Sequence, residues 1–209
     1  RRLTVDGVEA HFAVNVVAPF LLTHLLFPLL QRSAPSRVIT LSGGLPRPQV
    51  AVADLQAEHS FRGLVTYTRA KAAMMAMSYE FAERTRGSGV GMFVVYPGSA
   101  ETAMSRGLTP EMVPLALRLV WPLFRLMLRD TDGNSATRAA RSSIFAASDA
   151  RLNGQTGQYY DTNGRLTAWP PSVVDSADRA AVWHLCEAVT GISPETASTF
   201  HQPLHQQEA

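Results

Sequence analysis

Apolar and polar positions follow one another along this chain in a pattern that predicts helices and short buried strands. A first long apolar stretch runs from Val8 to Gln31, after the turn pair Asp6-Gly7. Residues 12 to 30 are apolar enough to suggest a membrane span. Polar residues and prolines that are unfavourable in lipid interrupt them: Asn15, Pro19, His24 and Pro28. We therefore predict a buried helix that covers a sheet.

Two β-branched runs that end in glycine predict buried strands. The first is RVITLSGG, from Arg37 to Gly44, and the second is VGMFVVYPG, from Val90 to Gly98. Between them, residues 65 to 86 repeat apolar positions at helical spacing: Ala70, Ala73, Met74, Met77 and Phe81. The order strand, helix, strand predicts a parallel pair with a right-handed crossover.

The C-terminal half continues the same alternation. Residues 132 to 148 predict a helix, GQYYD at 157 to 161 a third short strand, and residues 176 to 190 a last helix. These elements predict an α/β fold with a mainly parallel sheet. Ligands of such sheets bind beyond the carboxyl ends of the strands, where both glycine-bearing strand ends and the start of the 65–86 helix should meet.

Composition narrows the class of protein. With 209 residues, of which 46% are apolar, the chain can form one domain, and its net charge of +2 is spread without a basic run, so we expect no nucleic-acid partner. The single cysteine, Cys186, has no partner for a disulfide or a metal site, so we expect no metal and a reducing, cytoplasmic location. The chain begins Arg1-Arg2, without an export signal, as if its beginning were missing.

Lys71 is the only lysine among the nineteen basic residues, and it lies four residues after Tyr67. On a helix this spacing places both side chains on one face. A neighbouring ammonium favours the phenolate and lowers the pKa of a tyrosine, which makes proton exchange with a substrate oxygen feasible. Lysine suits this task better than the planar guanidinium of arginine. The pair predicts an acid–base site; the alternative is an exposed lysine beside a half-buried tyrosine.

Four motifs occur in order along the chain: FAVNVVAPFLLTHLL, RVITLSGG, YTRAK and VVYPGSAET. Together they resemble the short-chain dehydrogenase/reductase family, and the local sequence is similar to its retinol-dehydrogenase-like branch from Leu3 to about Gly191. The resemblance implies a Rossmann-like three-layer fold and NAD or NADP as the cofactor. It also implies an oxidoreductase that interconverts an alcohol and a carbonyl group.

The resemblance assigns roles to particular residues. Tyr67 would be the general acid/base, Lys71 would lower its pKa and hold the nicotinamide ribose, and Asn15 would hold a water in the proton relay. Pro97-Gly98 and Thr102 would border the nicotinamide. Read without the resemblance, Asn15 bonds to the backbone beside a helix kink, Pro97-Gly98 is an ordinary strand-ending turn, and Thr102 caps the following helix.

The family also places a serine after the first of these strands, where it hydrogen-bonds the substrate oxygen. Counting forward from Asn15 and Arg37, this position falls on Gly43; counting back from Tyr67, it falls on Ser42. A one-residue deletion at the turn reconciles both counts in favour of Ser42, which we predict as the catalytic serine. If Gly43 occupies the position, a donor to the oxyanion is lost, at a cost on the order of a hundredfold.

A dinucleotide fold needs a glycine-rich turn between a strand and a helix to hold the pyrophosphate. The glycines of residues 87 to 91 stop a helix and lead into a strand, so they do not match. The resemblance implies that this loop would precede Arg1. We therefore expect a partial Rossmann-type oxidoreductase domain at 1–192 and a flexible polar tail at 193–209. The alternative is a truncated, non-catalytic remnant that acts by protein or lipid association.

Residues 103 to 131 contain an apolar segment, Pro114 to Leu128, which is too short and too charged to span a bilayer. The resemblance implies a lid over a small lipophilic alcohol or carbonyl substrate. Two alternatives are a core or dimer-packing helix, and interfacial membrane contact in which Arg118 and Arg125 reach the head groups. By analogy with the family, a homodimer would pair through the helices at 8–31 and 65–86.

Overall fold

The computed structural model of the protein describes residues 1–44, 48–131 and 133–192. In these residues three strands form one parallel sheet in the order β1-β2-β3, with β1 at Ser36–Leu41, β2 at Val90–Val95 and β3 at Gln158–Tyr160. Strand β2 is buried throughout, because it has a partner on each side. The predicted α/β fold with a mainly parallel sheet is confirmed.

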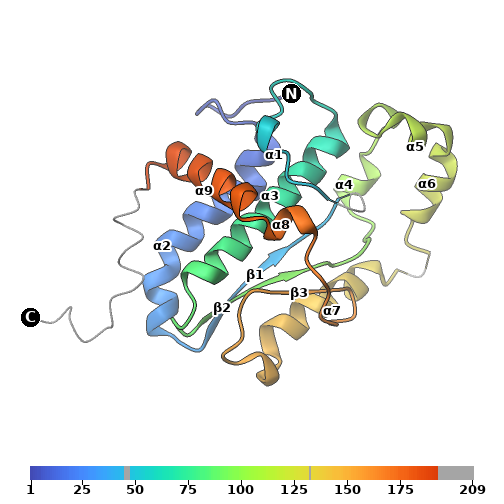
Figure 1. The fold of residues 1–209 in the computed structure, drawn as a ribbon. Coiled ribbons are helices and arrows are strands. Elements are labelled where there is room, and N and C mark those ends of the chain that lie inside the picture. The colour runs from blue at the N-terminus through green and yellow to red at the C-terminus, as the bar shows by residue number, and fades with distance from the viewer. Residues whose placement is uncertain (45–47, 132, 193–209) are drawn as a thin grey trace, which may run out of the picture.

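Two long helices cover one face of the sheet (Figure 1). The first is continuous from α1 (Ala10–Phe12) through a π-helical turn, η1 (Ala13–Val17), into α2 (Ala18–Arg32). The second is α3 (Gly63–Arg84), and all five residues predicted for its apolar face are buried: Ala70, Ala73, Met74, Met77 and Phe81. Both helices therefore lie where their apolar pattern placed them.

Two C-terminal helices, α8 (Pro171–Val174) and α9 (Ser176–Thr190), pack against α3 (Figure 1). Asp175 caps α9 by accepting hydrogen bonds from the amides of Ala177 and Asp178, and Gly191 ends it in the left-handed conformation. Because α9 covers α3, little of α3 is free for the pairing that was expected by analogy, and the homodimer stays a prediction.

The opposite face of the sheet carries α7 (Ser135–Ser148), followed by the short 3-10 helix η4 (Ala150–Leu152) (Figure 1). A second apolar cluster lies between α7 and the sheet: Phe93, Val95, Ala146, Leu152 and Tyr160. The layers are thus helices, sheet and helix, which is the three-layer arrangement that the sequence predicted.

The segment after β2 is built from short helices. They are α4 (Ala103–Arg106), η3 (Pro110–Met112), α5 (Leu115–Leu119) and α6 (Trp121–Met127); a further 3-10 turn, η2 (Val52–Asp54), precedes α3. The apolar stretch expected at 114–128 is therefore divided at Val120 into two helices. The expected tail at 193–209 lies outside the described residues.

The continuous helix Ala10–Arg32 is long and apolar enough to cross a membrane by length and composition, with a mean hydropathy of 1.9 and only 28% of that window buried. Its inner face nevertheless lies in the main core through Phe12, Val16, Phe20 and Phe27. Its outer face exposes Leu22, Leu25 and Leu29. The inner face agrees with the predicted helix that covers a sheet.

Candidate active site

Helix α3 carries Tyr67 and Lys71 on one face, as their spacing predicts. The Lys71 ammonium lies 5.8 Å from the centre of the Tyr67 ring. It donates a 2.9 Å hydrogen bond to the carbonyl oxygen of Leu41, the last residue of β1. Both side chains are half-buried. This contact ties the helix to the carboxyl end of the strand, which is the edge of the sheet where ligands bind.

Burial shifts the pKa of each group in the direction that favours its neutral form. It raises the pKa of Tyr67 above the ordinary value of a phenol and lowers the pKa of Lys71. A low-dielectric environment disfavours each charged form, which explains both directions. Lys71 faces the Tyr67 ring and the Leu41 carbonyl in this arrangement, so the predicted lowering of the phenol pKa by Lys71 stays a prediction.

At the end of β1, Gly43 rather than Ser42 faces Tyr67. A methyl group built on Gly43 would lie 3.2 Å from the Tyr67 hydroxyl. The Ser42 hydroxyl is buried and donates to the carbonyl of Val95 at 3.2 Å, and it also bonds the Tyr159 side chain. In extended chain successive side chains point in opposite directions. The geometry favours the Gly43 alternative, and the catalytic role of Ser42 stays a prediction.

Asn15 lies at the centre of the π-helical turn η1. The turn is closed by the amide of Ala18, which donates to the carbonyl of Ala13. The Asn15 side-chain amide donates to the carbonyl of His11 at 2.9 Å. Turns of this kind are rare and recur at functional sites, because they disturb the regular hydrogen-bond ladder of a helix. Asn15 thus bonds to the backbone at a helix irregularity, and its place in a proton relay stays a prediction.

Glu9 and His11 belong to the same region, although the sequence analysis did not select them. The Glu9 carboxylate is buried, contacts His11 Nδ1 at 2.8 Å and accepts a 3.0 Å hydrogen bond from the amide of Phe12. The His11 ring lies edge-on to Tyr67, with ring centres 6.2 Å apart. The sequence contained one signal for this pair, a carboxylate and an imidazole two residues apart at the start of a helix. The pair connects Asn15 with Tyr67 through the His11 backbone and ring.

The loop after β2 contains the other predicted cofactor residues. Gly98, which follows Pro97, has φ +76°, and a methyl group there would lie 2.7 Å from the Thr162 side chain. Only glycine fits this position without strain. Thr102 caps α4: its side chain accepts from the Ser105 amide, and the Ser105 hydroxyl accepts from the Thr102 amide at 2.8 Å. Thr102 therefore has the capping role that was left open for it.

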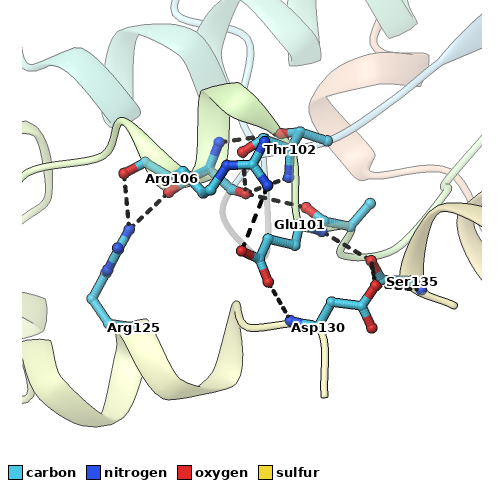
Figure 2. Close-up of polar contacts among 8 residues, drawn as sticks. Glu101, Thr102, Arg106, Arg125, Asp130 and Ser135 are labelled. Carbon is cyan, nitrogen blue, oxygen red and sulfur yellow. Dashed lines mark hydrogen bonds and ion pairs between the residues drawn. The ribbon is translucent and has the colours of Figure 1, made fainter. Parts of the chain in front are cut away.

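A polar network fixes the end of this loop (Figure 2). Glu101 accepts a hydrogen bond from the backbone amide of Asp130 and forms an ion pair with Arg106 at 3.7 Å. Ser135 donates to the Asp130 carboxylate at 2.6 Å. Arg125 donates from Nη1 to two carbonyl oxygens at the end of α4. The residues around Thr102 are therefore held in place by contacts with Arg125 and Asp130, near the end of the segment of short helices.

The described residues suit one end of a dinucleotide. Lys71 bonds the carboxyl end of β1 and Gly98 lies in the loop after β2, so both belong to the edge of the sheet where ligands of such folds bind. In residues 1–44, 48–131 and 133–192, no strand leads through a glycine-rich turn directly into a helix in the way that a pyrophosphate requires. Of the cofactor that the resemblance implies, these residues would hold the nicotinamide end.

Comparison with known proteins gives consistent matches. The sequence profile of the short chain dehydrogenases matches residues 1–112. Human retinol dehydrogenase 14 is 33% identical over 90% of this chain and 54% of its own length. Human retinol dehydrogenase 13 is 30% identical over 96% of the chain and 59% of its own length. The chain therefore spans a little over half the length of these relatives.

One solved structure gives an independent comparison of the fold. The crystal structure of an uncharacterized protein from Mycobacterium paratuberculosis superposes with a TM-score of 0.62 at 21% identity. The match covers 92% of this chain and 62% of that chain. At this identity the likeness concerns the fold alone.

Proposed function

The chain belongs to the short-chain dehydrogenase family, and we propose that it acts as an NAD(P)-dependent oxidoreductase that interconverts an alcohol and a carbonyl group. One observation carries the proposal. Tyr67 and Lys71 lie together on α3, and Lys71 bonds the carbonyl at the end of β1. This geometry supports the proposal, because it brings a phenol and a cation to the edge of the sheet where ligands of such folds bind.

In the reducing direction Tyr67 donates the proton of its hydroxyl to the substrate oxygen, while the carbonyl carbon gains a hydride. In the oxidising direction the Tyr67 phenolate takes the proton of the alcohol. A bound nicotinamide cofactor supplies or accepts the hydride. Lys71 stabilises the phenolate by its positive charge and would hold the ribose. Pro97, Gly98 and Thr102 would border the nicotinamide.

The substrate we propose is small and lipophilic. Met112 of η3 lies against Gly63 in the first turn of α3, with a methyl group built on Gly63 at 3.5 Å from it. The segment that begins there continues into the half-buried rings of Trp121 and Phe124, whose centres are 5.9 Å apart. An apolar segment beside the acid–base helix favours a lipophilic alcohol or carbonyl. The relatives named as retinol dehydrogenases fit this substrate class.

The test uses Tyr67→Phe in the natural protein, with a lipophilic alcohol and its aldehyde as substrates. Removing the hydroxyl leaves the ring in place, so we expect kcat to fall by about 10²–10⁴-fold, with nucleotide binding retained. Nucleotide fluorescence and steady-state turnover measure the two quantities separately. Full turnover by the variant would disprove the assignment. Tyr79→Phe is a matched control, because Tyr79 lies on the same helix against Trp169.

A second candidate function is association without catalysis. Gly43 brings no hydroxyl to the position beside Tyr67, and a missing oxyanion donor can cost on the order of a hundredfold in rate. Titration with NADH and with NADPH separates the two candidates. Saturable binding supports the oxidoreductase and also tells NAD from NADP. A protein that binds neither nucleotide would favour association and exclude the oxidoreductase.

A further inference from the structure

Helices α5 and α6 form a hairpin that projects from the carboxyl edge of the sheet (Figure 1). Its leucines are unusually exposed: Leu115 by 68%, Leu119 by 83%, Leu123 by 60% and Leu126 by 56%. Within α5 the first two are four residues apart, and within α6 the last two are three apart, so each pair shares a helix face. Exposed apolar side chains gathered on one hairpin in this way are typical of an interaction site. We call these four leucines the hairpin surface.

Cations outnumber anions by one around the hairpin surface. Arg106, Arg118, Arg125 and Arg129 lie in or beside the hairpin, against the acidic residues Glu101, Glu111 and Asp130. The Asp130 carboxylate accepts a hydrogen bond from Ser135 and lies 3.8 Å from Arg138. The Arg129 side chain is exposed. The outside of the hairpin therefore combines apolar side chains with an excess of cations.

Two of the arginines brace the hairpin. Arg118 donates to the carbonyls of Val113 and Glu111. Arg125 donates to the carbonyls of Ser105 and Arg106 (Figure 2). These bonds differ from the alternative in which both side chains reach the head groups, because each guanidinium satisfies carbonyls at the end of a short helix. The bonds from these arginines to backbone carbonyls thus hold the shape of the hairpin, and the exposed leucines take no part in them.

The base of the hairpin is closed as well. Glu101 joins the two ends of the segment, through Arg106 near its start and the amide of Asp130 at its finish (Figure 2). An apolar surface held out on a closed base needs a partner to cover it. A second copy in a symmetric pair would bring arginine-rich surfaces together, and like charges oppose each other. An anionic surface with an apolar interior complements both features.

We propose that the α5–α6 hairpin docks the protein on the surface of a membrane that contains anionic phospholipids. The hairpin surface enters the boundary between head groups and acyl chains, and the exposed Arg129 contacts the lipid phosphates. Helices this short cannot span the bilayer, so the contact is peripheral. This docking does not depend on nucleotide binding or on catalysis.

Vesicle flotation of the natural protein tests the proposal, with vesicles of phosphatidylcholine alone and of phosphatidylcholine mixed with phosphatidylglycerol. We expect binding to the mixed vesicles, and a loss of about tenfold or more in partitioning for Leu119→Asp combined with Leu123→Asp, because each change places a charge in the apolar boundary. Arg129→Gln should weaken binding to the mixed vesicles only. Unchanged circular dichroism shows that the exposed sites leave the fold intact.

Two other variants distinguish the rival surfaces. Ile144→Asp combined with Leu166→Asp is the matched control, because both residues are exposed at 61% and 66% and lie outside the hairpin; it should bind vesicles normally. Leu25→Asp combined with Leu29→Asp tests the exposed face of α2. The proposal is overturned if the natural protein does not float, if the hairpin variant floats like the natural protein, or if only the α2 variant loses binding. A hairpin variant that converts an oligomer to a monomer and still floats would assign the surface to a second copy.

Discussion

Gly43 lies so close to Tyr67 that a methyl group on it would be 3.2 Å from the phenol oxygen. The backbone of Gly43 does not have the positive φ of its neighbour Gly44, so a side chain is compatible with its conformation. We expect Gly43→Ser to raise kcat by about tenfold or more, because its hydroxyl would add a donor beside the acid. Steady-state turnover of an aldehyde at saturating nucleotide measures the gain.

The comparison variant is Gly43→Ala, which adds the same contact without a hydroxyl. The methyl group requires a shift of a few tenths of an ångström in Tyr67, so turnover should stay level or fall. Equal gains in both variants would show that packing, and not hydrogen bonding, limits the natural enzyme. Equal losses would show that the position must remain open for the substrate.

Lys71→Met tests the electrostatic role of the lysine. Burial raises the pKa of Tyr67, and a neighbouring ammonium favours the phenolate. Without the ammonium, alcohol oxidation should require a higher pH, and its rate at neutral pH should fall by about 10²-fold or more. The pH profile of kcat reports the shift. A lower rate with an unchanged profile would limit Lys71 to holding the nucleotide.

Arg69→Met is the control for that experiment. Arg69 is on the same helix, but its guanidinium bonds the carbonyl of Ser60 and lies 3.6 Å from Asp54, away from the phenol. Loss of such a partly exposed ion pair has little effect on stability. The pH profile of this variant should match that of the natural protein.

Gly98→Ala should destabilise the loop after β2. A non-glycine residue at φ +76° costs about 1–2 kcal/mol, and its methyl group would lie 2.7 Å from Thr162. The same change at Gly154, at φ +74°, meets nothing within 4 Å. Urea unfolding should therefore show a larger loss for Gly98→Ala than for Gly154→Ala. Equal losses would mean that the loop shifts easily to accommodate the methyl group, so that its conformation is not fixed by the contact with Thr162.

The helical periodicity was sufficient to predict that Tyr67 and Lys71 share a face, because residues four apart on any regular helix do so. The same reasoning could not detect the π-helical turn around Asn15. A π-helical turn contains one residue more than a regular helical turn, and here it packs against α3 and α9. The apolar pattern of the chain is nearly the same with or without this extra residue. Elements with a clear period were predictable, and local departures from that period were not.

The position beside Tyr67 shows a second limit. Ser42 and Gly43 are adjacent, and a shift of one residue in extended chain exchanges which of them faces the phenol. Counting between motifs cannot resolve a single residue. The hydrogen bond from Ser42 to Val95 settles the orientation, and it arises only when β1 and β2 pair. Arg118 likewise bonds carbonyls that exist as free acceptors only after the short helices form.

His24 should make the stability of the protein fall at acidic pH. Its ring is buried among Phe20, Phe81 and Trp183, and Nδ1 donates to the Phe20 carbonyl at 3.0 Å. Burial lowers the pKa of His24, against weaker opposing effects from the hydrogen bond to the Phe20 carbonyl and from Glu187. The unfolded chain, in which histidine titrates near 6.5, then binds more protons than the folded one.

The expected result is a free energy of unfolding that decreases as the pH falls below about 6.5 and levels off once it is below the folded pKa of His24. His24→Phe keeps a ring of similar size and removes the titration, so its unfolding free energy should depend less on pH over this range. Urea unfolding on both sides of that pH measures the difference, and His184→Phe, at an exposed position of α9, is the matched control. If the natural protein and His24→Phe lose stability in parallel on acidification, the acid sensitivity lies in other groups, because the variant no longer has the titrating imidazole.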